Sequence, residues 1–75
     1  MTRLSELQSG ETGRLSAMEC TSVLRLRLLE LGFLPGATVR LVRRVPVAGL
    51  VEIECRGCHL SLRMSEAALV LVELS

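Results

Sequence analysis

Two cysteines and a histidine stand close together in the second half of the chain, where they could hold a metal or a haem. Residues 55–59 read Cys-Arg-Gly-Cys-His, the C-x-x-C-H spacing typical of covalent haem attachment. Thiolate and imidazole are also common zinc and iron ligands, and Cys20 is one further thiol. Every such site needs its side chains to converge, so the element that carries them decides which chemistry is available.

These residues fall in a predicted β-hairpin. Apolar and polar residues alternate through 51–55 and 58–63, and the Arg56-Gly57 pair between them suits a two-residue turn. A hairpin closed by this turn pairs Cys55 with Cys58 on its buried face. The other residues expected on that face are Val51, Ile53, Leu60 and Leu62.

His59 belongs to the opposite face of the same hairpin, which we expect to face water. The register places it across from Glu54, a surface partner for an imidazole. Since the imidazole and the thiols point away from one another, we expect no resident metal or other cofactor and interpret both cysteines as small buried hydrophobes. The alternative is a metal carrier or sensor that uses Cys20, Cys55, Cys58 and His59.

No catalytic constellation is visible in the sequence. The chain has no Asp and no Lys, and His59 has no nearby nucleophile on its own face. Gly32 and Gly36 follow a predicted helix instead of preceding one, so they do not form a phosphate-binding loop. We therefore expect a binding module and not an enzyme.

Composition narrows the class of partner. The 75 residues suit a single domain, 1–75, and 49% of them are hydrophobic with only one aromatic, Phe33. The net charge is +1, which attracts neither a phosphate backbone nor an anionic membrane. Because base stacking also needs aromatic side chains, we expect no nucleic acid partner.

The sequence favours a cytoplasmic protein. No apolar run reaches the roughly 18 residues of a membrane span, and the first residues contain no hydrophobic signal region. Three cysteines are an odd number, which favours free thiols over a disulfide framework. Contact with a membrane is therefore expected only indirectly, through a partner.

The elements that must position these residues can be read in order. Leu4 and Leu7 should dock on the edge of the core, and a first strand is expected between Gly13 and Glu19. Thr21 or Ser22 caps a helix that runs to Leu31. The segment 28–42 then forms a helix-to-strand corner, in which Gly32 stops the helix and Pro35-Gly36 turns the chain.

The second half is expected to be β-rich. A strand through Val39 and Leu41 should contain a β-bulge near Arg43, and residues 46–50 form a loop. After the hairpin, Ser65 caps one helical turn and Val70–Leu74 form a last strand. About five short strands and one main helix predict a mostly β, SH3-like barrel.

The helix presents apolar residues on two opposite sides at about 100° per residue. The side expected to face the sheet holds Leu24, Leu28 and Leu31. The opposite side, called the second stripe below, holds Leu26, Leu29 and Phe33. One small sheet covers only one side, so the second stripe is either roofed by the N-terminal leucines and the corner or exposed to a partner.

Two long runs resemble the FeoA family of small proteins associated with bacterial ferrous iron uptake. They are LLELGFLPGATVRLVRR at 28–44 and VEIECRGCHLSLRMSEAALVLVE at 51–73. The Leu-Gly-apolar-x-Pro-Gly corner at Leu31 to Gly36 is a particularly specific part. The sequence departs from the family pattern in the loop 46–50 and at Cys55 and Cys58.

The resemblance implies an SH3-like barrel that acts as an accessory factor on FeoB, a membrane ferrous iron transporter with a cytosolic GTP-binding domain. Exposed apolar residues rimmed by arginine are plausible contacts for that transporter. The residues expected to bind it are Leu26, Leu29, Phe33, Arg43, Val47 and Leu50. The sequence leaves open a generic SH3-like peptide- or RNA-binding module and a weak homo-oligomer.

Overall fold

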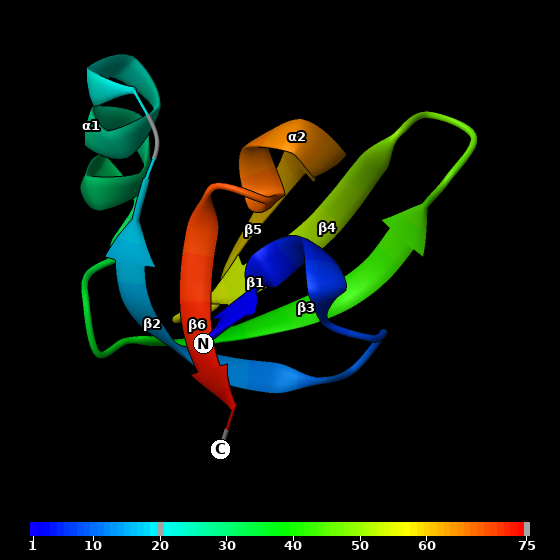
Figure 1. The fold of residues 1–75 in the computed structure, drawn as a ribbon, viewed down its shortest axis with the longest axis horizontal. Helices are drawn as coiled ribbons and strands as arrows, with labels where there is room; N and C mark the ends of the chain where they lie inside the picture. Colours follow the sequence, from blue (N-terminus) through cyan, green and yellow to red (C-terminus); the bar gives the residue numbers. More distant parts are fainter. Residues whose placement is uncertain (20, 75) are drawn as a thin grey trace.

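The computed structural model describes residues 1–19 and 21–74. These residues form six strands, two α-helices and one 3₁₀ turn, arranged as a curled sheet with α1 standing beside the end of β2 (Figure 1). The strands are β1 (Thr2–Arg3), β2 (Thr12–Met18), β3 (Thr38–Val45), β4 (Leu50–Cys55), β5 (Cys58–Arg63) and β6 (Val70–Leu74). The helical elements are the 3₁₀ turn Leu4–Glu6, α1 (Ser22–Glu30) and α2 (Met64–Ala67).

All described strands join one antiparallel sheet in the order β1-β6-β2-β3-β4-β5. The register shifts in β2 between Leu15 and Ala17, and in β3 between Leu41 and Arg43. The second shift is the bulge predicted near Arg43. Such bulges sharpen the bend of a strand, which lets a short sheet curl around one core without closing β1 onto β5. The mostly β, barrel-like fold with one main helix is confirmed.

The described core is aliphatic apart from Phe33 and Cys55. Leu4 and Leu7 are fully buried, as expected for side chains that dock on the core. Arg44 fixes the turn that carries them, because its guanidinium donates hydrogen bonds to the carbonyls of Ser5 and Leu7. The other buried residues are Leu15, Leu24, Leu28, Phe33, Ala37, Val39, Leu41, Val51, Ile53, Cys55, Leu62, Ala67, Val70 and Val72.

The end of α1 follows from backbone geometry. Gly32 adopts a φ of +92°, a left-handed conformation that disfavours a side chain. Its N–H donates to Leu29 O at 3.1 Å, and the N–H of Phe33 donates to Leu28 O at 3.0 Å. These two bonds define a Schellman motif, which satisfies helix carbonyls and directs Phe33 back against Leu28 in the core.

The corner is completed by a turn through Pro35 and Gly36. The N–H of Ala37 donates to Leu34 O at 2.9 Å, and Gly36 has a φ of +90°. This geometry is that of a type II β-turn, which favours proline at its first central position and glycine at its second. Gly36 N and Ala37 O also bond to Leu15 of β2 at 2.7 and 2.8 Å, so the corner is anchored directly to the sheet.

The hairpin of β4 and β5 has the predicted register. Cys55 pairs with Cys58, and Glu54 pairs with His59. Both turn residues have positive φ, 54° at Arg56 and 79° at Gly57, the geometry favoured by a tight two-residue hairpin. Cys58 and Leu60 are only half-buried, which corrects the expectation of a fully buried face, because β5 lies at the edge of the sheet.

Several boundaries differ from the sequence-based expectation, and α1 ends at Glu30 instead of Leu31. β2 begins and ends one residue earlier than predicted, and Leu50 already belongs to β4, so the loop covers only 46–49. α2 begins at Met64 after Arg63, not after a Ser65 cap. The Glu66 carboxylate accepts the backbone N–H of Arg63 at 2.9 Å, so the carboxylate caps this turn in place of the serine. β6 has the predicted bounds.

Candidate protein-binding site

The Cys-Arg-Gly-Cys-His segment does not gather its ligands at one point. His59 Nε2 lies 3.6 Å from Glu54 Oε2 on the outer face, whereas Cys55 is buried in the core on the other face. Within residues 1–19 and 21–74, no three His, Cys, Asp or Glu side chains are placed to hold a metal ion. Cys20, which the metal hypothesis also invoked, lies outside the described residues.

Cys55 is instead part of the packing around the α1 corner. Its Sγ lies 3.7 Å from the carbonyl oxygen of Gly32, and its side chain is 1% exposed. Burial raises the pKa of the Cys55 thiol, with a smaller opposing effect from the Arg56 charge. The thiol is therefore protonated at neutral pH and donates weakly to that carbonyl.

The six residues expected to bind a partner do not form one surface. Phe33 is 1% exposed, so it belongs to the core, which corrects the expectation that it shares an exposed stripe. Leu26 is 59% exposed, so the opposite expectation, a roofed second stripe, is wrong for this residue. Arg43, Val47 and Leu50 belong to the β3–β4 hairpin, which ends on the far side of the molecule from α1 (Figure 1).

One candidate surface is the outward side of α1, called the α1 outer face below. Val23 is 81% exposed and Leu26 is 59% exposed. A shallow hollow of about 510 Å³ lies next to them, and it is lined by Thr21, Ser22, Arg25, Leu26 and Leu29. Two exposed apolar side chains rimmed by hydroxyl and guanidinium groups give this face the apolar centre and polar rim that are typical of protein interfaces.

The fold holds this face in place through the first turn of the helix and its buried inward side. Thr21 is the N-cap, and its Oγ1 accepts the N–H of Leu24 at 3.5 Å. Arg25 Nη2 donates to Met18 O at 2.8 Å, which ties the first turn to the end of β2. Leu24 and Leu28 bury the inward side, so the outward side is fixed in orientation without being covered.

The end of the β3–β4 hairpin is a weaker candidate. Val47 is fully exposed, but Leu50 is half-buried. Arg43 is engaged by Glu52, with Nη2 to Oε1 at 2.7 Å and Nε to Oε1 at 2.9 Å. This hydrogen bonding lowers the pKa of Glu52 and raises that of Arg43, so both groups stay charged and paired. One exposed valine is left for a partner.

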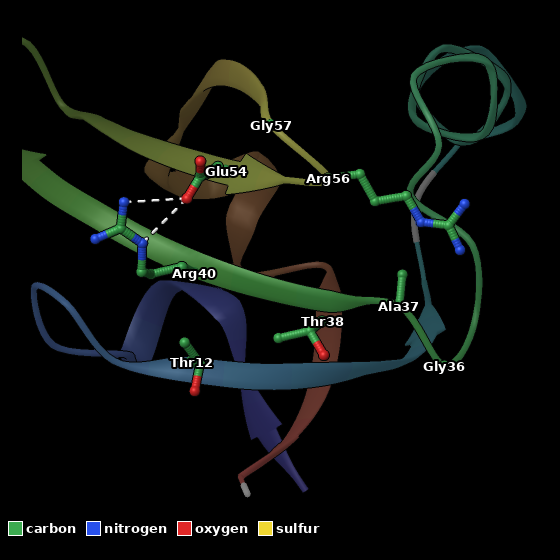
Figure 2. A pocket seen from close by; sticks show the side chains of 8 residues that line it. All are labelled: Thr12, Gly36, Ala37, Thr38, Arg40, Glu54, Arg56 and Gly57. Atoms are coloured by element: carbon green, nitrogen blue, oxygen red, sulfur yellow. Dashed lines mark hydrogen bonds and ion pairs between the residues drawn. The ribbon is translucent and has the colours of Figure 1, made fainter.

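A third feature, which sequence reasoning missed, is a polar groove on the outer face of the sheet (Figure 2). Its volume is about 540 Å³, and it is lined by Thr12, Gly36, Ala37, Thr38, Arg40, Glu54, Arg56 and Gly57. Arg40 Nη2 lies 3.0 Å from Glu54 Oε1, so these two charges compensate each other. Figure 2 shows Arg56 extending from the hairpin turn toward the segment that joins α1 to β3.

The groove residues come from β2, β3, β4 and two turns, which explains why no local motif revealed them. The pairing of Arg40 with Glu54 depends on the register between β3 and β4. The only signal in the sequence is that Arg40 points away from Val39 and Leu41, which places it on the outer face. Its partner could not be read from that alternation.

The comparison with protein families shows to which family this chain belongs. The model of the FeoA domain matches residues 2–74. The chain belongs to the FeoA family. This family is associated with ferrous iron transport, and it is a small accessory SH3-like domain that is not a known enzyme family.

One relative joins a FeoA part to a transporter. The Fe(2+) transport protein A/Fe(2+) transporter FeoB fusion protein of Porphyromonas gingivalis is 38% identical over 72 residues, which are 96% of this chain. This chain spans only 8% of the length of that relative. The likeness therefore concerns the FeoA part of the fusion protein.

Solved FeoA structures share the fold. The solution structure of a FeoA protein from Chlorobium tepidum is 30% identical to this chain in sequence and has a TM-score of 0.92. The match covers 97% of this chain and 70% of the Chlorobium tepidum chain. FeoA of Stenotrophomonas maltophilia, described as a prokaryotic SH3 domain protein complexed with zinc, is 31% identical with a TM-score of 0.83. That match covers 97% of this chain and 91% of the other.

In the described part of this chain, no helix is long and apolar enough to cross a membrane.

Proposed function

We propose that this FeoA-family protein is a non-enzymatic accessory factor of ferrous iron uptake that binds the cytosolic part of a FeoB-type transporter through its α1 outer face. The exposed apolar helix face carries the proposal. Val23 and Leu26 are apolar and exposed on an element whose other side is packed into the core. A rigid face needs little ordering on binding, which favours association even when the contact area is small.

The relative from Porphyromonas gingivalis supports a direct contact between the two proteins. Its name joins Fe(2+) transport protein A and the FeoB transporter in one chain. Linking two modules makes their contact intramolecular and raises its effective concentration. A contact that is weak between separate proteins gains most from such a link, which agrees with the limited size of the α1 outer face.

An NMR titration tests this function. Isotope-labelled protein is titrated with the purified cytosolic GTP-binding domain and with the other cytosolic segments of the transporter. We expect amide shifts that concentrate on residues 22–30, and a Leu26→Ser variant that binds at least about tenfold more weakly, which corresponds to about 1.4 kcal/mol. Leu74→Ser is the matched control, because Leu74 is 52% exposed and lies on β6 instead of α1.

The outcomes separate the candidate surfaces. Shifts centred on Val47 that are weakened by Val47→Ser would assign binding to the β3–β4 hairpin and contradict the α1 outer face. Shifts around Arg40 and Arg56 would assign it to the polar groove. No shift with any cytosolic segment at millimolar concentration would contradict direct binding altogether.

A further inference from the structure

The Cys-Arg-Gly-Cys segment is not used by the proposed function, and its geometry suits a different chemistry. Cys55 and Cys58 are free thiols that pair directly across the β4–β5 hairpin. The Arg56-Gly57 turn has positive φ at both residues, so the two cysteines are the hydrogen-bonded pair that closes the turn. We propose that Cys55 and Cys58 form a reversible thiol–disulfide site that acts on the adjoining end of α1.

The distance between the two positions permits the bond. Residues that close such a turn have Cα atoms about 5.5 Å apart, within the range of roughly 4.4–6.8 Å found across disulfides. Because they form a hydrogen-bonded pair, their Cβ atoms lie at the long end of the range of about 4.5–5.5 Å for paired strands, whereas a disulfide needs about 3.8 Å. The hairpin must therefore bring the two Cβ atoms closer by more than about 1 Å to close the bond, and such a strained bond is reduced more readily than a relaxed structural disulfide.

The two sulfurs differ in access, which sets the order of reaction. Cys58 lies half-buried on the edge strand, whereas Cys55 is 1% exposed. An oxidant therefore meets Cys58 first. Burial raises the pKa of Cys55, which keeps this thiol protonated and makes it the slower of the two cysteines to react.

With a disulfide oxidant such as oxidised glutathione, the exchange balances in two steps. The Cys58 thiolate attacks one glutathione sulfur, forms a mixed disulfide and releases one glutathione thiolate. Cys55 then loses its proton to solvent and attacks the Cys58 sulfur, which forms the Cys55–Cys58 bond and releases the second glutathione thiolate. Two protein thiols are oxidised, and one glutathione disulfide is reduced.

The bond reaches α1 through one contact. The Cys55 thiol donates to the carbonyl oxygen of Gly32 at 3.7 Å, and Gly32 is the residue that ends the helix. A sulfur in a disulfide has no S–H, so this hydrogen bond is lost on oxidation. Closing the hairpin also draws Cys55 toward Cys58. The oxidation state therefore changes the surroundings of Gly32 and Phe33 at the end of α1.

The test uses the full-length chain with Cys20→Ala, so that only the two hairpin thiols react. The protein is equilibrated with oxidised and reduced glutathione, quenched with acid, alkylated and weighed intact. We expect a species that is lighter by two hydrogens, resists alkylation and returns to the dithiol in excess reduced glutathione. Adding Cys55→Ala should halt the reaction at the mixed disulfide, and adding Cys58→Ser should slow it at least tenfold.

Two results would overturn the proposal. One is a persistent mixed disulfide on the Cys20→Ala protein, which would show that Cys55 cannot reach Cys58. The other is a Cys58→Ser variant that reacts as fast as its parent. Circular dichroism verifies that each variant is folded, with Cys55→Ala chosen because it places no hydroxyl in the core.

An NMR measurement on the oxidised protein tests the link to α1. The amides of Gly32 and Phe33 should shift on oxidation, while Gly10, in a turn at the start of the sheet, stays unchanged. Unchanged Gly32 and Phe33 signals in a fully oxidised sample would refute that link. Because these measurements read covalent state and local structure, they are independent of whether the transporter is the partner.

Discussion

Leu28 and Leu26 provide a direct test of how the structure divides the helix. Both are leucines in the interior of α1, two residues apart, but Leu28 is 1% exposed and Leu26 is 59% exposed. Replacing either one with alanine changes helix propensity by the same small amount, so a difference between the variants reports burial alone. A buried Leu→Ala change removes packing and leaves a cavity, which costs about 2–5 kcal/mol.

The expected effects are far apart on the scale of the whole domain. A chain of 75 residues is stable by about 4–11 kcal/mol, so Leu28→Ala removes a large share of the free energy of unfolding. Leu26→Ala should stay within about 0.5 kcal/mol of the parent, as exposed positions usually do. With a urea slope of about 1 kcal/mol per molar, Leu28→Ala should lower the midpoint by about 2 M or more, and Leu26→Ala by less than about 0.5 M.

Urea denaturation followed by circular dichroism measures both midpoints, and the slope verifies that each variant still unfolds in one step. Equal shifts for the two variants would refute the assignment of Leu26 to the surface. A large loss in Leu26→Ala would mean that the second stripe is covered after all, and the α1 outer face could not then be a free binding surface.

Three further predictions concern the turns and the charged pairs. Arg56→Asn should raise the free energy of unfolding by up to about 1 kcal/mol in urea denaturation, because asparagine tolerates the φ of 54° better than arginine does; a loss of stability would contradict this account of the turn. Glu66→Ala should lower the thermal midpoint by an amount equivalent to about 0.5–1 kcal/mol, since the Arg63 N–H loses its acceptor, whereas Ser65→Ala should have little effect. The pKa of Glu52 is held below its usual value of 4.5 mainly by the hydrogen bond from Arg43. The stabilisation by this pair is therefore present above pH 4.5 and is lost as the pH falls through the folded-state pKa of Glu52. In Arg43→Gln, an NMR titration of the Glu52 carboxyl should show a higher pKa, and an unchanged pKa would count against the pairing.

The sequence alone determined the local structure where a few residues carry the whole signal. The Arg56-Gly57 turn with its alternating flanks predicted the hairpin and the pairing of Cys55 with Cys58, which excluded a shared site with His59. Gly32 and Pro35-Gly36 likewise predicted the corner. Glycine tolerates a positive φ that other residues avoid, and the ring of proline fixes its own φ, so both preferences can be read from the sequence. The long match to the FeoA pattern indicated the family, which the domain comparison confirmed.

Only the tertiary structure decided which apolar side chains are covered. Periodicity placed Leu26 and Phe33 on one side of a continued helix, but the Schellman motif at Gly32 turns the chain and sends Phe33 into the core, while Leu26 stays exposed. Burial on β5 was overestimated for a similar reason, because the alternation of a strand does not reveal that it lies at the edge of the sheet. The polar groove gathers residues from separate strands, so it exists only once the sheet has curled and its registers are set.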